Sequence, residues 1–204
     1  MVFEYEWLLN RRNKATQLVQ LQREHLTKIV MNYFSKRTLA YLLDCLISYT
    51  IVMLVIQLAI LSQFRASLGI TNEWLANSWN MQLYVLTTIS FPIWLYFVYF
   101  DSEKSKGTFG KRMMKLSVCD NNEKRLELGK SFLRTFLKLS PWEIIHAGLI
   151  FPNPIYFENE PSTRIVVYGG IVLFVVYAVS IIFNTNRQSL YDQLIDSKVI
   201  STNL

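Results

Sequence analysis

Residues 165–183 read IVVYGGIVLFVVYAVSIIF, a run without a single charged side chain. A helix needs about 20 apolar residues to cross the hydrocarbon core of a bilayer, and this run has that length and composition. Two further apolar runs, 39–61 and 82–100, are of similar length. Asp44 and Gln57 interrupt the first of them, and a proline predicts a kink in the second. The three runs predict membrane-spanning helices.

The composition agrees with a membrane protein and argues against a soluble globular domain. Of the 204 residues, 51% are hydrophobic and only 18% are charged, and the apolar residues occur in blocks. The formal charge of +6 does not indicate nucleic-acid binding, because the basic residues lie between the apolar blocks, as in cytoplasmic membrane loops. Cys45 and Cys119 have neither a metal-ligand spacing nor the pattern of a disulfide framework.

A fourth segment, 132–151, is less apolar than the other three. It reads FLRTFLKLSPWEIIHAGLIF, and hydropathy alone leaves open whether it crosses the membrane or is re-entrant. All but two of the 21 Lys and Arg residues lie in the N-terminal region, in the loop 101–131, at the start of the fourth segment or in the tail 184–204; the exceptions are Arg65 and Arg164. Because positive residues favour the cytoplasmic side, this distribution predicts four crossings of the cell membrane with both termini inside.

The remaining parts of the chain predict small cytoplasmic elements. Residues 1–36 form an N-terminal region in which 15–34 read as a basic amphipathic helix, able to lie on anionic lipid or to dock against a partner. In the inner loop, 115–119 and 125–128 alternate polar and apolar residues around a turn, which predicts a β-hairpin. The predicted fold is therefore an all-α membrane protein: a four-helix transmembrane bundle over 37–200, with a small cytoplasmic β-hairpin and an N-terminal amphipathic helix.

A polar stripe runs along the first span at spacings of three and four residues, and its members are Arg37, Tyr41, Asp44 and Ser48. Residues at this spacing share one helix face, which must point to the bundle interior or to a water-filled cavity. Two interpretations of Asp44 stay open: it pairs with Arg37 or another cation and holds the helices together, or it binds a proton or an ion in a transport path. Asp192, just after the last span, would lie at the depth of Arg37, so an Arg37–Asp192 pair is a further hypothesis.

Glu143 and His146 form a second polar cluster on one face of the fourth segment. Histidine titrates near neutral pH, so the pair could relay protons; alternatively it lines a wet helix end. Two ligands without a third do not indicate a metal site. No set of nucleophile, base and orienting group can be assembled, so we expect neither an enzyme nor a cofactor.

Three stretches of the chain resemble the RDD family of membrane proteins: Arg37–Asp44 (RTLAYLLD), Thr108–Val118 (TFGKRMMKLSV) and Arg187–Asp192 (RQSLYD). The resemblance covers roughly residues 34–200. It implies that Arg37, Asp44 and Asp192 are the three residues that give the family its name.

The second stretch resembles the family's inner-loop motif, and its residues of interest are Thr108, Gly110, Lys111 and Arg112. Without the resemblance, the same residues predict only a tight turn that leads into the hairpin. The chain departs from the family at Lys115, where a glycine is usual, at Tyr191, where a histidine is usual, and at 195–197, where an alanine-glycine-threonine turn is usual.

The resemblance implies more about architecture than about activity, because transport is only suspected for the family and cation/proton exchange is proposed for some members. We expect either a small transporter or exchanger that uses the intramembrane carboxylate Asp44, or a non-catalytic accessory, immunity or assembly subunit of a larger membrane complex. Four helices enclose little volume, so the transporter would work as a homo-oligomer in the lipid bilayer.

Overall fold

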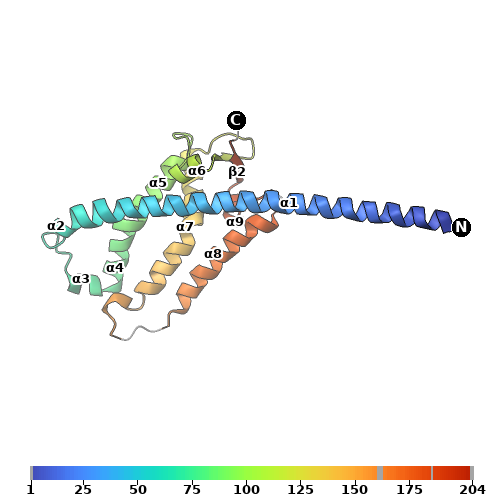
Figure 1. Ribbon diagram of the computed structural model, residues 1–204. Coiled ribbons are helices and arrows are strands. Elements are labelled where there is room, and N and C mark those ends of the chain that lie inside the picture. Colours follow the sequence, from blue (N-terminus) through green and yellow to red (C-terminus); the bar gives the residue numbers. More distant parts are fainter. Residues whose placement is uncertain (1, 160–162, 185, 203–204) are drawn as a thin grey trace. The chain divides into compact units, whose positions relative to one another are not determined.

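The computed structural model describes residues 2–159, 163–184 and 186–202, with side chains from Gln17 onward, and is mostly helical (Figure 1). The chain divides into two compact units, 1–36 and 37–204. The first unit is the N-terminal part of helix α1 (Val2–Ile51). Among the side chains described from Gln17 onward, Leu18 is 66% and Leu21 is 63% exposed.

Three helical stretches are long and apolar enough, by length and composition, to cross a membrane, within the described residues. The first, Gln17–Phe64, runs from α1 through the π-helical η1 (Val52–Leu61) into α2 (Ser62–Phe64). The second, Ser78–Asp101, consists of α4 (Ser78–Val85), the π-helical η2 (Leu86–Ser90) and α5 (Phe91–Asp101). The third is α8 (Ile165–Phe183). The prediction of a helical membrane protein is therefore supported, and each of the three most apolar runs lies in a helix long enough to cross a bilayer.

The fourth predicted segment is also a helix, α7 (Leu128–Ile150), but it is less apolar than the three candidate spans. Its buried face carries two cations, Arg134 and Lys138, beside Thr135 and Leu139. Helix α7 packs against both α5 and α8 (Figure 1). The charged side chains that made the membrane crossing of this segment ambiguous in the sequence thus face the neighbouring helices.

Glycines allow α7 and α8 to approach closely. A Cβ atom on Gly170 would lie 2.6 Å from Ile145 Cγ1 and 2.8 Å from the Pro141 carbonyl oxygen, whereas a Cβ on Gly169 would meet nothing within 4 Å. We expect Gly170→Ala to destabilise the protein by about 1–3 kcal/mol, because the added methyl group overfills a packed interface. Gly169→Ala, one residue away, should leave stability unchanged or raise it slightly. Thermal unfolding of both variants in the same detergent measures the difference; equal melting temperatures would contradict the packing.

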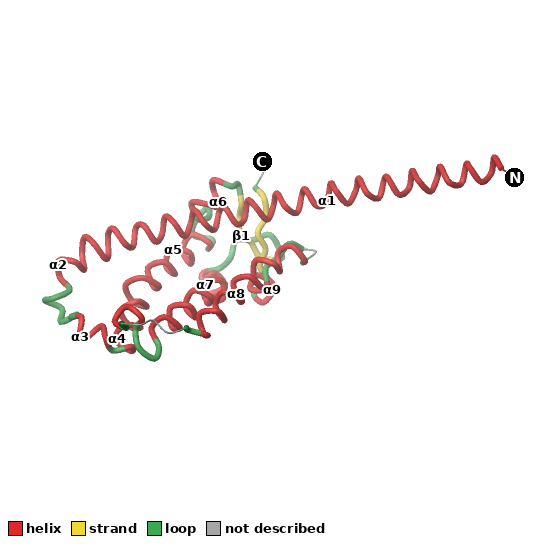
Figure 2. Tube along the Cα trace, turned by 60° about the horizontal axis from the view of Figure 1, so that its bottom comes forward, coloured by secondary structure: helices red, strands yellow, loops and turns green. Residues whose placement is uncertain are grey.

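The small sheet differs from the predicted hairpin. Strand β1 (Leu116–Asp120) lies where the inner-loop strand was predicted, but it pairs antiparallel with β2 (Ser197–Ser201) of the C-terminal tail, with Val118 opposite Val199 (Figure 2). The predicted partner, 125–128, is not a strand: Leu126 makes one isolated bridge to Ser102, and helix α7 begins at Leu128. The alternation in 125–128 was therefore the loop leading into a helix.

Each strand is entered through a residue in the left-handed backbone region. Lys115, before β1, has φ +53°, and Asp196, before β2, has φ +51°. Residues other than glycine adopt this conformation at a cost, because their Cβ crowds the backbone. In the RDD resemblance described above, both positions are occupied by glycine, the residue that adopts a left-handed backbone most easily. This chain has Lys115 and Asp196 there instead.

Short elements complete the structure. They are α3 (Asn72–Ala76), α6 (Phe109–Met113), η3 (Ile155–Phe157) and α9 (Leu190–Leu194). A small apolar core of Leu75, Met81 and Ile150 joins the α3–α4 connection to the end of α7. Helices α6 and α9 and the sheet lie at the other end of the helices, and they bring the polar residues of the candidate site together.

Candidate functional site

The polar stripe of the first span faces the interior of the second unit, as predicted. Arg37, Asp44 and Ser48 are buried, together with Ala40 on the same face, and Tyr41 is half-buried beside them. The Tyr41 hydroxyl accepts a hydrogen bond of 2.7 Å from the indole nitrogen of Trp142. The spacing of the stripe follows the 3.6-residue period of an α-helix, so a single face of α1 presents every member inward.

Asp44 holds the inner-loop motif. Its carboxylate accepts hydrogen bonds from the Thr108 hydroxyl at 2.5 Å, the Gly110 amide at 2.7 Å and the Tyr96 hydroxyl at 2.9 Å. The Phe109 amide in turn donates to the Tyr96 hydroxyl at 3.1 Å. Since the first amides of a helix lack intrahelical acceptors, the carboxylate satisfies the N-terminal turn of α6 from the first span. The contacts of Asp44 thus come from neutral donors, not from Arg37.

The glycine of this motif is required by a close backbone contact. A Cβ on Gly110 would lie 2.2 Å from the Ala40 carbonyl oxygen, so α6 rests directly on the backbone of α1. The two basic residues that follow have separate roles. Lys111 is buried and forms an ion pair with Asp101, whereas the Arg112 guanidinium lies 5.9 Å from the centre of the Phe100 ring.

A buried charge network continues from this contact. Arg37 forms an ion pair with Asp192, as hypothesised from the sequence. Arg134 joins two carboxylates: its Nε lies 2.8 Å from Asp192 Oδ1, and its terminal nitrogen lies 2.8 Å from Asp101 Oδ2. Lys138 Nζ lies 3.8 Å from the same Asp101 oxygen. The network thus connects α1, α5, α6, α7 and α9, which are far apart in the sequence.

Asp192 is held in its ionised form by this arrangement. Burial alone would raise the pKa of its carboxyl group, but the charges of Arg134 and Arg37 outweigh that effect and hold the pKa well below the usual range. The Ser189 hydroxyl donates to the same carboxylate at 2.8 Å and forms a capping box with it at the start of α9. Tyr191 accepts a hydrogen bond of 3.1 Å from Arg37, so the residue that replaces the family's histidine also takes part.

Three members of the network were not among the residues singled out from the sequence: Asp101, Arg134 and Lys138. Arg134 and Lys138 served there only to orient the helices. The spacing of Arg134 and Lys138 could nevertheless have indicated their role. Two cations four residues apart in a predicted span share one face, which must point inward toward opposite charges. Lys138 also lies 3.3 Å from the centre of the Phe97 ring, a contact that nothing in the sequence indicated.

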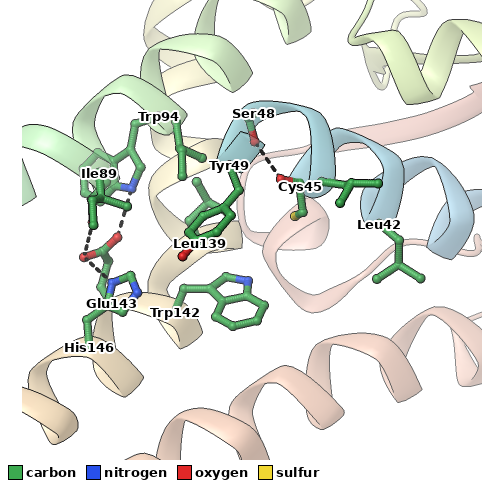
Figure 3. A pocket seen from close by; sticks show the side chains of 13 residues that line it. Leu42, Cys45, Ser48, Tyr49, Ile89, Trp94, Leu139, Trp142, Glu143 and His146 are labelled. Carbon is green, nitrogen blue, oxygen red and sulfur yellow. Dashed lines mark hydrogen bonds and ion pairs between the residues drawn. The ribbon is translucent and has the colours of Figure 1, made fainter. Parts of the chain in front are cut away.

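Glu143 and His146 lie apart from this network, at the wall of a crevice of about 530 Å³ (Figure 3). The Glu143 carboxylate accepts hydrogen bonds from the Ser90 hydroxyl at 3.1 Å and from the Trp94 indole nitrogen at 3.3 Å. His146 Nδ1 lies 3.9 Å from the carboxylate, which is beyond hydrogen-bond distance. The crevice has three walls, formed by α1 around Ser48, by η2 and α5, and by α7. The described residues contain no group of three or more His, Cys, Asp or Glu side chains that could hold a metal ion.

Three helices are long and apolar enough to span a bilayer, and a buried charge network connects two of them, α1 and α5, so the fold indicates a helical membrane protein. The chain belongs to the RDD family: the model of that family matches residues 33–196. No curated protein and no solved structure matches the chain. The resemblance stated from the sequence is therefore confirmed.

Proposed function

We propose that this protein is a small membrane transporter, a cation/proton exchanger that uses an intramembrane carboxylate, and that the carboxylate is Glu143 rather than Asp44. One comparison supports this assignment. Asp44 lines a cavity of about 20 Å³, enough for a single water molecule, whereas Glu143 lines the crevice of about 530 Å³. A carboxylate that exchanges its counter-ion needs access, and the side chain of Glu143 is 22% exposed while Asp44 is fully buried.

The topology of the proposal has four crossings, with both termini on the cytoplasmic side of the cell membrane. Helix α7 would make the third crossing, its cations Arg134 and Lys138 being compensated by Asp101 and Asp192 inside the protein. Compensation of this kind removes the main objection to placing a charged helix in a bilayer. The network itself would have a structural role, and the transporter would work as a homo-oligomer.

Flux measurements test the assignment of Glu143. In proteoliposomes loaded with a pH-sensitive dye and an acidic buffer, NaCl, KCl and tetraethylammonium chloride are added outside in turn, and the cation that the protein exchanges should raise the internal pH. We expect Glu143→Gln to reduce this exchange to the level of empty liposomes, because an amide cannot bind the cation and the proton in turn. Glu73→Gln, on an exposed carboxylate of α3, is the matched control and should keep the full rate.

Asp44→Asn distinguishes the structural role proposed for Asp44 from the transport role proposed for Glu143. It should lower the yield of folded protein, yet the rate per folded molecule should persist. Loss of exchange in Asp44→Asn together with full exchange in Glu143→Gln would overturn the assignment.

A second function, that of an accessory subunit, has one observation in its favour. The unit formed by residues 1–36 lies almost wholly outside the family match, which begins at residue 33, and it exposes apolar residues such as Leu18 and Leu26. Extraction in a mild detergent followed by light scattering distinguishes the two functions. A second protein in stoichiometric amount would favour the subunit, and a homo-oligomer alone would favour the transporter.

A further inference from the structure

The crevice beside Glu143 has features that favour one class of ligand. Each of its three walls contributes one aromatic ring: Tyr49 from α1, Trp94 from α5 and Trp142 from α7 (Figure 3). The rest of the lining is largely aliphatic, and its aliphatic members are Leu42, Leu46, Ile89, Ile93 and Leu139. Its volume of about 530 Å³ lies in the range of pockets that enclose small organic ligands.

Apart from Ser48, Cys45 and the Tyr49 hydroxyl on the α1 wall, the polar groups of the crevice gather around Glu143. The Glu143 carboxylate is joined there by the Ser90 hydroxyl, the Trp94 indole N–H and the side chain of His146. In apolar surroundings an ionised carboxylate is stabilised most by an opposite charge, and two neutral hydrogen-bond donors supply only part of that stabilisation. The crevice therefore has its greatest complementarity toward a positively charged group placed near Glu143.

The lining also selects the kind of cation. A small inorganic ion would have to replace its hydration shell with oxygen ligands, and the mainly apolar walls are poorly suited to that task. A large organic cation is weakly hydrated, buries apolar substituents against Leu139 and Ile93, and interacts favourably with aromatic rings. We infer that the crevice is a binding site for a lipophilic organic cation, with Glu143 as its counter-ion. The inference rests on the proposed function, since it names the class of cation that the exchanger would accept.

Binding of two ions of the same shape and opposite charge tests the inference. Protein purified in an uncharged detergent is dialysed against radiolabelled tetraphenylphosphonium or tetraphenylborate, with empty micelles as the background. We expect saturable binding of the phosphonium cation only. Glu143→Gln should weaken it at least about tenfold, and Glu73→Gln should leave it unchanged. Ile93→Trp, which adds bulk to the lining of the crevice and keeps the carboxylate, should abolish it.

Equal binding of both ions, or cation binding that survives both Glu143→Gln and Ile93→Trp, would overturn the inference and indicate simple partition into an apolar groove or lipid site. The outcome is independent of the flux experiment. Exchange of Na⁺ or K⁺ that depends on Glu143, without phosphonium binding, would leave the transporter proposal standing and refute the organic-cation site. Phosphonium binding without any exchange would support the organic-cation site and refute the transporter proposal.

Discussion

Replacing Arg134 with methionine will cost about 3–5 kcal/mol of folding stability, the largest effect that we expect from any single substitution outside the spans' apolar faces. Arg134 is 1% exposed and is shared by two buried carboxylates, on Asp101 and Asp192, at 2.8 Å each. Methionine keeps most of the apolar volume but leaves both carboxylates with fewer compensating charges in a region shielded from water. Thermal unfolding in detergent, with the yield of monodisperse protein, measures the loss.

Two variants control for the change of charge and of side-chain shape. Lys130→Met removes a cation one turn earlier on α7, where the side chain is exposed, and should leave stability within about 0.5 kcal/mol of the parent protein. Arg134→Lys keeps the charge but not the planar group that reaches two carboxylates, so an intermediate loss is expected. If Arg134→Met and Lys130→Met unfold at the same temperature, the bridging role is wrong.

Gly110→Ala adds only one methyl group, and we expect it to destabilise the protein by about 3 kcal/mol. The new Cβ would lie 2.2 Å from the Ala40 carbonyl oxygen, so α6 must move away from α1. That movement also lengthens the hydrogen bonds from the Gly110 amide and the Thr108 hydroxyl to the buried Asp44 carboxylate. For a chain of this length, a loss of that size lowers the melting temperature by roughly 6–12 °C.

Gly129→Ala is the matched control, because Gly129 also lies in a helix but has nothing within 4 Å of its Cβ position. It should be neutral or slightly stabilising. Ala40→Gly should not rescue Gly110→Ala, since the obstructing atom belongs to the backbone of residue 40 and not to its side chain. Rescue by Ala40→Gly would show that the contact between α1 and α6 has been misassigned.

The apolar spans and the inward stripe of α1 could be predicted because both depend on local patterns. A run such as 165–183 has few alternatives to a membrane helix. Likewise, Arg37 and Asp44 lie on one face of α1 by helical geometry alone. The ion pair between Arg37 and Asp192 could be hypothesised for a related reason: Arg37 begins the first apolar run and Asp192 follows the last, so a topology with both termini on one side would place the two charges at the same depth.

The sheet and the centre of the charge network could not be predicted in the same way, because they depend on pairings between distant segments. The sequence 116–120 identifies a strand, but not that its partner is 197–201 rather than the alternating residues next to it. Asp101 ends an apolar span, a position where a charged residue is ordinarily taken to face water. In the structure Asp101 is instead buried, because it forms ion pairs with Arg134 of α7 and Lys111 of α6.

The pairing of Arg37 with Asp192 joins positions 155 residues apart, and this has a consequence for how the protein is made. During synthesis, the first span and α7 are complete before Asp192 leaves the ribosome. Until then Arg37 and Arg134 lack the carboxylate of Asp192, although Arg134 already has that of Asp101, and β1 lacks β2. A nascent chain interrupted before residue 190 therefore lacks the Asp192 carboxylate and the partner strand of β1, and we expect it to be less stable than the finished protein.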